Sequence, residues 1–306
     1  MVIRSFAALR AAMAARPPLD LAVAGGDDPN VLAGVIAGFE AGLVASAAIS
    51  GDAGRIAAAL PAALRDRIRL LSAETPAACA AAAVAELRAG RAGVLMKGHV
   101  DSAAYLRAVV DRDAGIRGSG ILSNLTLAEM PSVPRLIGAT DNGIIPAPTL
   151  EQKRAIVLNA LPLFRGLGLD QVRVAAIAAS EKVSDRQPAT GDAAALAAMA
   201  RAGDLPGLII DGPFGYDVAI SRPAAEAKGL GGSDVAGQAD LILFPNIEAA
   251  NATAKAWKLH GQAQTGSLVL GAAAPVLLNS RADGPDRRVT GLIMAHCVLA
   301  GQAACA

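Results

Sequence analysis

The stretch Pro275-Val276-Leu277-Leu278-Asn279-Ser280-Arg281-Ala282-Asp283 is the most informative part of the sequence. It begins as a short apolar run, typical of a buried strand, and then presents a hydroxyl, a cation and a carboxylate. In open α/β sheets, ligands bind in the crevice beyond the carboxyl ends of the strands. An arginine offers a planar fork of donors that suits phosphate. The stretch therefore favours an α/β fold with a site for a phosphate or phosphoryl ester at a strand end.

Similar apolar runs recur along the chain and alternate with longer, alanine-rich segments. The predicted strands are Leu19–Ala24, Leu43–Ile49, Ile68–Leu71, Gly93–Met96, Ile121–Leu127, Leu136–Ala139, Val172–Ala178, Leu208–Ile210, Leu241–Phe244, Leu268–Leu270 and Val276–Leu278. Thr149 and Gln152 form a capping box that opens one predicted helix, and Pro76 fits the first turn of another. This alternation predicts a mainly parallel sheet with helices on both faces.

Composition excludes several classes of protein. The chain has 306 residues, of which 53% are hydrophobic and only 3% aromatic, so aliphatic side chains must fill a substantial core. A net charge of +1 without a basic tract argues against nucleic acid as a partner. The cysteines Cys79, Cys297 and Cys305 are dispersed and form no metal-binding pair, so we expect a cytoplasmic protein. The apolar segment Val31–Gly51 contains Glu40 and several glycines, and it predicts helix, turn and strand rather than a membrane span.

Candidate ligand-binding residues also follow other predicted strands. They are Lys97, Thr140, Asp141, Asp211, Asp217, Asn246, Glu248, Asn251 and Lys255. Asn246 and Glu248 open a helix whose free N–H groups favour anions. Each segment alone is also explained by a bland alternative: a Gly-Pro turn with solvated acids, an Asn-Gly turn, or a solvated helix face. Together they are what a doubly wound sheet needs to build one cleft, so we expect them to converge.

The sequence lacks the motifs of several other enzyme classes. It contains no P-loop and no G-x-S-x-G nucleophile elbow, and Gly229–Gly232 lacks the spacing of a dinucleotide-binding turn. His99, His260 and His296 are isolated and do not have the spacing of metal ligands. The sequence therefore predicts no metal site.

A series of ordered motifs identifies a known family. They are LMKG at Leu95–Gly98, ATD at Ala139–Asp141, SEKVSDRQPATGDAAAL at Ser180–Leu196, DGPFGYDVAIS at Asp211–Ser221, KGL at Lys228–Leu230, VAGQADLILFPNIEAAN at Val235–Asn251 and SRAD at Ser280–Asp283. Together these segments resemble the phosphate acetyl/butyryltransferase family, and the butyryl branch more closely than the acetyl branch. The resemblance runs from about Leu19 to Leu299.

The resemblance implies two α/β/α domains around a cleft, as in isocitrate and isopropylmalate dehydrogenases. Residues 1–120 and 275–306 would form the first domain, and residues 121–274 the second. It also implies reversible transfer of a short-chain acyl group between coenzyme A and inorganic phosphate by a homodimer. Coenzyme A is then a substrate, and no bound cofactor or metal is expected.

The resemblance also suggests catalytic roles. Ser280 and Arg281 would stabilise the developing charge and bind phosphate. A carboxylate base would take the proton of the coenzyme A thiol, and Asp283 is the first candidate and Asp286 the second. The acetyltransferase branch has its base where this chain has Arg287. Further departures at the expected cleft are Asn142, Gly143, Ala250 and Asn279, where relatives usually have Ala, Ala, Gly and Thr.

Two alternative functions stay open. One is an NAD-dependent decarboxylating dehydrogenase of the same fold, which would need a metal-binding carboxylate cluster and a nucleotide loop. The other is a protein that binds coenzyme A or an acyl phosphate without turnover, which the cation at Arg287 motivates. A turnover assay separates an enzyme from such a binding protein.

Overall fold

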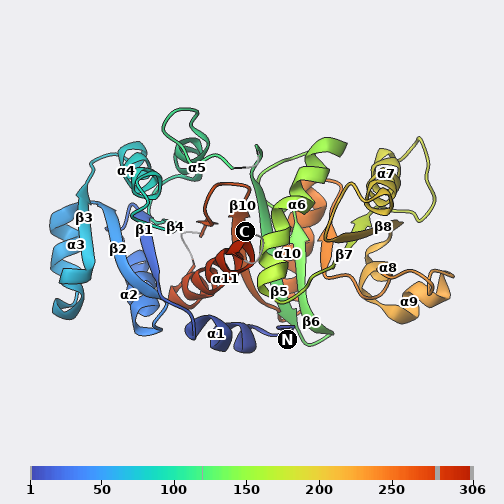
Figure 1. Ribbon diagram of the computed structural model, residues 1–306, viewed down its shortest axis with the longest axis horizontal. Helices are drawn as coiled ribbons and strands as arrows, with labels where there is room; N and C mark the ends of the chain where they lie inside the picture. The colour runs from blue at the N-terminus through green and yellow to red at the C-terminus, as the bar shows by residue number, and fades with distance from the viewer. Residues whose placement is uncertain (1, 119, 280–282, 304–306) are drawn as a thin grey trace. The chain divides into compact units, whose positions relative to one another are not determined.

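The computed structural model describes residues 2–118, 120–279 and 283–303, which form a mixed α/β fold with a large sheet and helices (Figure 1). The strands are β1 (Leu19–Ala24), β2 (Val44–Gly51), β3 (Ile68–Ser72), β4 (Val94–Lys97), β5 (Ser123–Met130), β6 (Val133–Thr140), β7 (Val172–Ile177), β8 (Leu208–Phe214), β9 (Leu241–Leu243), β10 (Gln264–Leu270) and β11 (Val276–Leu277). Each predicted strand is confirmed, with somewhat different ends.

The helices fill the segments between these strands. They are α1 (Phe6–Ala14), α2 (Pro29–Glu40), α3 (Ala53–Ala59), α4 (Pro76–Arg88), α5 (Ser102–Val110), α6 (Leu150–Gly166), α7 (Pro188–Ala202), α8 (Tyr216–Ile220), α9 (Arg222–Ala227), α10 (Ile247–Leu259) and α11 (Pro285–Ala303), with a short 3₁₀ helix at Ala62–Arg67. Both predicted helix starts are confirmed. Thr149 and Gln152 form the capping box of α6, and Pro76 lies in the first turn of α4.

The chain divides into two compact units. The β1 unit, named after a central strand, comprises residues 7–120 and 266–299, and the β9 unit comprises residues 1–6, 121–265 and 300–306. The domain boundaries that the resemblance implies, 1–120 with 275–306 and 121–274, stay a prediction.

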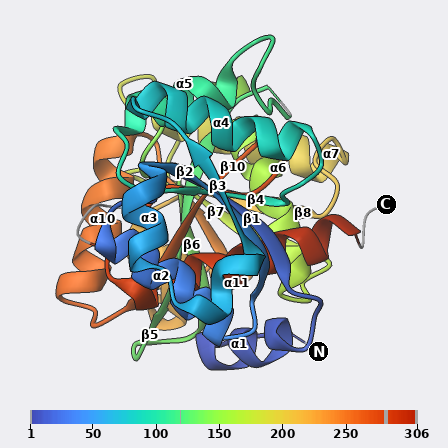
Figure 2. The same ribbon diagram turned by 90° about the vertical axis from the view of Figure 1, so that its left-hand side faces the viewer.

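The β1 unit carries its strands in the order β3-β2-β1-β4-β11-β10. All of these strands are parallel except β10, which runs antiparallel to β11. Helices α4 and α5 lie on one face of the sheet, and α2 and α11 lie on the other (Figure 2). The connections change direction between β1 and β4, the kind of switch point at which α/β sheets bind ligands. Leu277 of β11 pairs with Met96 of β4, so the chain after β11 leaves the sheet beside Lys97.

Helix α2 packs closely against α11 through two glycines. A Cβ on Gly34 would lie 2.3 Å from Cδ of Arg288, and a Cβ on Gly38 would lie 2.8 Å from Cδ1 of Leu292. Asp28 caps the helix by accepting hydrogen bonds from the N–H groups of the first turn. The segment Val31–Gly51 is thus helix, turn and strand, as predicted. None of the helices in the described part of the chain is long and apolar enough to cross a membrane.

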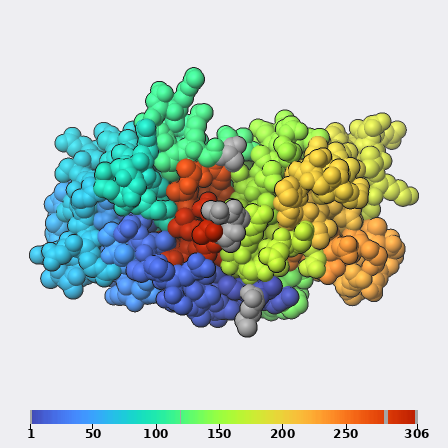
Figure 3. Space-filling model, viewed as in Figure 1, coloured from blue at the N-terminus to red at the C-terminus, as the bar shows by residue number. Residues whose placement is uncertain are grey.

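The β9 unit carries its strands in the order β5-β6-β9-β7-β8. Strands β5 and β6 form an antiparallel hairpin, and the remaining neighbours are parallel. Helix α10 packs on β5, β6 and β9 around Trp257, Phe244 and Ile137, which belong to one buried cluster. Helix α7, coloured yellow, lies at the surface on the face of this unit that Figure 3 shows.

One local prediction is wrong. The segment after Ile210 was expected to form a Gly-Pro turn, but strand β8 continues to Phe214. The register with β7 shifts at this point, and a Cβ on Gly212 would lie 2.5 Å from the main-chain oxygen of Ala176. The missing side chain lets the two strands stay close, so the strand passes through the Gly-Pro pair. Asp211 is therefore a strand residue, and only Asp217 follows the end of the strand.

Candidate active site

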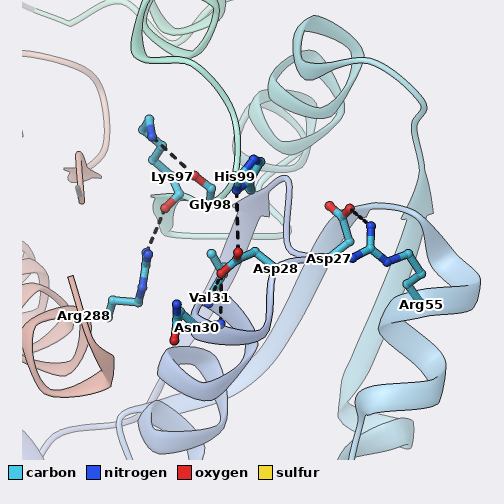
Figure 4. A network of polar contacts seen from close by, with 9 residues as sticks. All are labelled: Asp27, Asp28, Asn30, Val31, Arg55, Lys97, Gly98, His99 and Arg288. Atoms are coloured by element: carbon cyan, nitrogen blue, oxygen red, sulfur yellow. Dashed lines mark hydrogen bonds and ion pairs between the residues drawn. The ribbon is translucent and has the colours of Figure 1, made fainter. Parts of the chain in front are cut away.

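Lys97 ends strand β4 at the carboxyl edge of the β1 unit. Its side chain is buried, with Nζ 3.4 Å from the main-chain oxygen of Gly98. The main-chain oxygen of Lys97 accepts a 3.1 Å hydrogen bond from Nη1 of Arg288 (Figure 4). Since Lys97 and Arg288 lie far apart in the sequence, the bond ties the end of β4 to the first turns of α11.

A tyrosine holds the same strands from the other face. Tyr105 of α5 is completely buried, and its hydroxyl lies 3.2 Å from the main-chain oxygen of Leu95 and 3.1 Å from that of Leu277. These oxygens belong to β4 and β11, the two strands that lead to Lys97 and to the Ser280–Asp283 segment. The carboxyl ends of both strands are therefore fixed by side chains from neighbouring helices.

Arg288 was not among the predicted residues. Its side chain is 1% exposed, and its Nε has no hydrogen-bond partner within the part of the chain that the structure describes. Burial lowers the pKa of its guanidinium, and the nearby carboxylates of Asp283 and Asp28 oppose that shift. Residue type alone does not distinguish Arg288 from the adjacent Arg287, which is exposed.

The predicted catalytic residues follow β11 in the sequence. Ser280 and Arg281 lie outside the described residues. The Asp283 side chain is 15% exposed, and its Oδ1 accepts a 2.9 Å hydrogen bond from Nη1 of Arg287. Asp286 is exposed in the first turn of α11. Of the two candidate bases, Asp283 is therefore the more sheltered.

A pocket that was not predicted opens at the carboxyl ends of β1, β2 and β3. Its volume is about 660 Å³, and its lining includes Asp27, Arg55, Cys79 and His99. Asp27 pairs with Arg55 at 3.4 Å, and Nδ1 of His99 lies 3.6 Å from Asp28 (Figure 4). Acidic and basic side chains lie close together here within one unit. Several of them directly follow strands in the sequence, which is the signal that could have found them.

In the β9 unit, Asp141 holds together the turn after β6. Its carboxylate oxygens accept hydrogen bonds from the main-chain N–H groups of Asn124 (3.0 Å), Gly143 (3.0 Å), Ile144 (3.1 Å) and Ile145 (2.8 Å). Burial raises the pKa of this carboxyl, and the four N–H groups counteract the rise. These hydrogen bonds give Asp141 a structural role in the turn. Its role in binding a substrate stays a prediction.

Three predicted residues of this unit come together around Asn124 and Asn142. Thr140 Oγ1 donates to the main-chain oxygen of Asn124, and Asn251 Nδ2 donates to that of Asn142, both at 3.1 Å. The Asn142 side chain lies between its partners, donating to Thr126 Oγ1 at 2.7 Å and accepting from Asn124 Nδ2 at 2.6 Å. The structure thus brings Thr140, Asp141 and Asn251 to one strand end, and the departure Asn142 is at the centre of the network.

The other candidates on α10 differ in their surroundings. Asn246 caps the helix, with Oδ1 accepting a 2.9 Å hydrogen bond from the N–H of Ala249. Glu248 and Lys255 are exposed, as a solvated helix face would predict. Ala250, where relatives usually have glycine, is completely buried.

Asp211 and Asp217 take part in a different set of contacts. Asp211 accepts a 2.6 Å hydrogen bond from Ser233 Oγ. Asp217 lies 3.3 Å from Lys228 Nζ, which also binds Glu181 at 2.7 Å. The hydrogen bond between Lys228 and Glu181 lowers the pKa of the Glu181 carboxyl and raises that of the Lys228 ammonium group.

This ion-paired group links three of the motifs that carry the family resemblance, SEK, DGPFGYD and KGL. It does not join the Thr140 group, because β9 and β7 separate β6 from β8. Three strand spacings of roughly 4.8 Å place the two strand ends about 14 Å apart.

The described residues offer neither a metal cluster nor a reactive thiol. No group of three or more His, Cys, Asp or Glu side chains among them could hold a metal ion. Cys79 and Cys297 are buried thiols, and burial raises the pKa of both, that of Cys297 to about 12. Such thiols are inert at neutral pH.

Comparison with known proteins assigns the chain to a family. Residues 71–296 match the family model described as "Phosphate acetyl/butaryl transferase". The chain is 35% identical over 277 residues to a probable phosphate butyryltransferase from Bacillus subtilis, covering 90% of this chain and 92% of the relative. It is 39% identical over 218 residues to a phosphate butyryltransferase from Clostridium beijerinckii, covering 71% of this chain and 72% of that one.

A solved structure shares the fold of this chain. A branched-chain phosphotransacylase from Enterococcus faecalis superposes with a TM-score of 0.81 at 24% identity, covering 92% of this chain and 99% of that structure. The matched segment 71–296 includes every candidate residue from Lys97 to Asp286. The chain belongs to the phosphate acetyl/butyryltransferase family.

Proposed function

We propose that this protein catalyses reversible transfer of a short-chain acyl group between coenzyme A and inorganic phosphate. The family match over residues 71–296 carries the proposal, because it contains all the candidate residues. The arrangement of the β1 unit supports it. Lys97 ends β4, and β11 pairs in parallel with β4, so both strands lead to the same carboxyl edge of the sheet.

The chemistry requires a base and a group that stabilises charge. The thiol of coenzyme A loses its proton to a carboxylate as the sulfur attacks the carbonyl carbon of the acyl phosphate. A C–S bond forms, the C–O bond to phosphate breaks, and phosphate leaves with the bonding pair. We assign Ser280 and Arg281 to the oxyanion and the departing phosphate, and Asp283 to the base, with Asp286 as its alternative.

The same proposal places the remaining candidates in substrate binding. Lys97 from the β1 unit, and Thr140, Asp141, Asp211, Asp217, Asn246, Glu248, Asn251 and Lys255 from the β9 unit, would bind coenzyme A or the acyl phosphate. The contacts of Thr140 and Asn251 at one strand end support this role more strongly than the exposed positions of Glu248 and Lys255.

We also propose the arrangement that the family resemblance implies. Two α/β/α domains would enclose a cleft, as in isocitrate and isopropylmalate dehydrogenases, and two chains would form a homodimer. The buried thiols of Cys79 and Cys297 fit a reducing, cytoplasmic location. Light scattering coupled to size-exclusion chromatography tests the dimer, since a monomer mass would contradict it.

A second candidate function is binding of coenzyme A or an acyl phosphate without turnover. The ion pair between Arg287 and Asp283 favours it, because it engages the first candidate base. The family match favours the enzyme, because the named relatives are transferases.

Thiol release from acyl-CoAs distinguishes the two functions. A panel from acetyl-CoA to hexanoyl-CoA is incubated with the protein, with and without inorganic phosphate, and free thiol is measured. Phosphate-dependent release is expected, and the best chain length identifies the substrate class. Binding of coenzyme A without release from any of these acyl-CoAs would favour the binding protein instead.

A further inference from the structure

The surroundings of Arg288 are unusual for a charged residue. Its guanidinium is buried, its Nε lacks a hydrogen-bond partner among the described residues, and its Nη1 donates a hydrogen bond to the main-chain oxygen of Lys97. Burying a charge is costly unless it is paired or used. No carboxylate in residues 2–118, 120–279 and 283–303 forms an ion pair with this guanidinium, although the charges of Asp283 and Asp28 act on it. Within those residues, the burial of this charge does not stabilise the fold by an ion pair, so the arginine is expected to serve another purpose.

The neighbouring helix is adapted to this side chain. Three carbons of Arg288, its Cβ, Cγ and Cδ, lie within 3.2 Å of where a Cβ of Gly34 would be. Gly34 lies in the middle of α2 and has no positive φ, so no backbone conformation demands a glycine there. Glycine in a helix is destabilising relative to alanine. The absence of a side chain at Gly34 is therefore explained by Arg288, whose carbons occupy the place that a Cβ would fill.

Arg288 acts on the strand end that the proposed reaction uses. Its Nη1 binds the main-chain oxygen of Lys97, the last residue of β4, and Tyr105 holds β4 and β11 from the opposite face. The guanidinium is buried, and its hydrogen bond goes to the main chain of Lys97 (Figure 4). Any effect on the reacting atoms therefore passes through the residues that it holds.

We propose that Arg288 is a positioning residue for acyl transfer, which fixes the end of β4 and the start of α11 so that Lys97 and Asp283 are correctly placed. The inference rests on the proposed function. A misplacement of about 1 Å away from the reacting atoms can slow an enzyme about 100-fold. Arg288 thus affects the rate without contacting the substrate.

The first test replaces Arg288 and separates kcat from KM. In Arg288→Gln we expect kcat to fall roughly 10- to 100-fold, with KM for acyl-CoA changed less than about threefold. Arg288→Lys keeps one donor for the Lys97 oxygen and should recover part of kcat. Rates are expressed per folded molecule, from the circular dichroism signal and the unfolding transition.

Arg67 provides a control for the general effect of losing a hydrogen bond between an arginine and a main-chain oxygen. Its guanidinium also binds main-chain oxygens at the end of a strand, those of Val44 and Ala45 at 2.8 and 2.9 Å. These oxygens lie at the amino end of β2, away from the catalytic candidates. Arg67→Gln should lower stability and leave kcat within about twofold of the wild type.

The second test displaces Arg288 without changing it. Gly34→Ala puts a Cβ 2.3 Å from Arg288 Cδ, whereas Gly38→Ala, one turn later on the same helix, meets Leu292 and Val44 instead. We expect Gly34→Ala to lower kcat and Gly38→Ala to leave it unchanged at comparable stability. If Gly34 acts through Arg288, the double variant with Arg288→Gln is no slower than Arg288→Gln alone.

The outcomes separate this inference from the proposed function. Wild-type protein without phosphate-dependent thiol release refutes the proposed function itself. Active wild type, with kcat within about twofold in both folded Arg288→Gln and Gly34→Ala, refutes the positioning role. The positioning role is also refuted if Gly38→Ala slows the reaction as much as Gly34→Ala, because the slower rate would then come from a general disturbance of helix packing. If Arg288→Gln does not fold, the two glycine variants decide the question.

Discussion

Nη1 of Arg287 lies 2.9 Å from Oδ1 of Asp283, four residues earlier in the chain. By resemblance, the acetyltransferase branch has its base at the position of Arg287. Here that position holds a cation, and its partner is the acid of the SRAD motif. The pair orients the Asp283 carboxylate through its Oδ1.

This arrangement predicts that Asp283, rather than Asp286, provides the base. Asp283→Asn should lower kcat about 100-fold or more, within the usual contribution of general acid–base catalysis of 10² to 10⁴. Asp286→Asn is the matched control and should stay within about twofold, because its side chain is exposed. Steady-state kinetics with butyryl-CoA and phosphate measures both. The reverse pattern would move the role to Asp286.

The proposed role of Arg281 predicts a loss of transition-state stabilisation. Arg281→Ala should lower kcat/KM for acyl transfer at least about tenfold, which corresponds to roughly 1.4 kcal/mol. Arg107→Ala removes an exposed cation from α5 and is the control for the change in net charge. An unchanged kcat/KM in Arg281→Ala would exclude the residue from the mechanism.

The contact between Asn142 and Thr126 predicts a measurable coupling energy. Asn142→Ala leaves the buried Thr126 hydroxyl without this partner, and we expect the free energy of unfolding to fall by about 1–3 kcal/mol. Thr126→Val alone should also destabilise. In the double variant the losses should be less than additive, with a coupling of about 0.5–3 kcal/mol, which urea unfolding of all four proteins determines. Strict additivity would mean that the 2.7 Å hydrogen bond contributes nothing.

His296 predicts how stability depends on pH. It is buried, and Nε2 lies 2.9 Å from the main-chain oxygen of Leu43, so that nitrogen carries a hydrogen. Burial lowers the pKa of the imidazole below 6.5, its value in an unfolded chain. The native state then binds fewer protons than the unfolded state, so this contribution to stability is complete above about pH 6.5 and is lost as pH falls toward the folded pKa.

Chemical denaturation between about pH 5 and 7.5 measures this effect. We expect the wild type to lose stability on acidification across that range, and His296→Asn to show a smaller change, because its side chain does not titrate. An identical pH dependence in both proteins would assign the loss to other groups.

Local patterns were enough to predict most secondary structure. The run Leu19–Ala24 and the capping box at Thr149 are signals over a few neighbouring residues, and β1 and α6 appear where those signals place them. The Gly-Pro pair after Asp211 misled the prediction, because a glycine that permits a turn also permits two strands to approach closely. Only the position of β7 distinguishes these possibilities.

The candidate site was predictable only in part. The polar residues at strand ends were visible because parallel strands bring their carboxyl ends to one edge. Thr140, Asp141 and Asn251 do meet, whereas Asp211 belongs to β8, three places from β6 in the sheet order. The order of the strands is a long-range property, so no local pattern could separate these groups.

The sequence by itself determined the family and the α/β class, because motifs such as SRAD and the alternation of apolar runs are written in consecutive residues. The tertiary structure alone decided which of two adjacent arginines is buried. Arg287 and Arg288 are chemically identical, but Arg287 faces solvent and pairs with Asp283, whereas Arg288 passes over Gly34 to the main-chain oxygen of Lys97. The physical reason is that a helix turns neighbouring side chains to different sides, and only the packing of α11 against α2 and the sheet determines what each side meets.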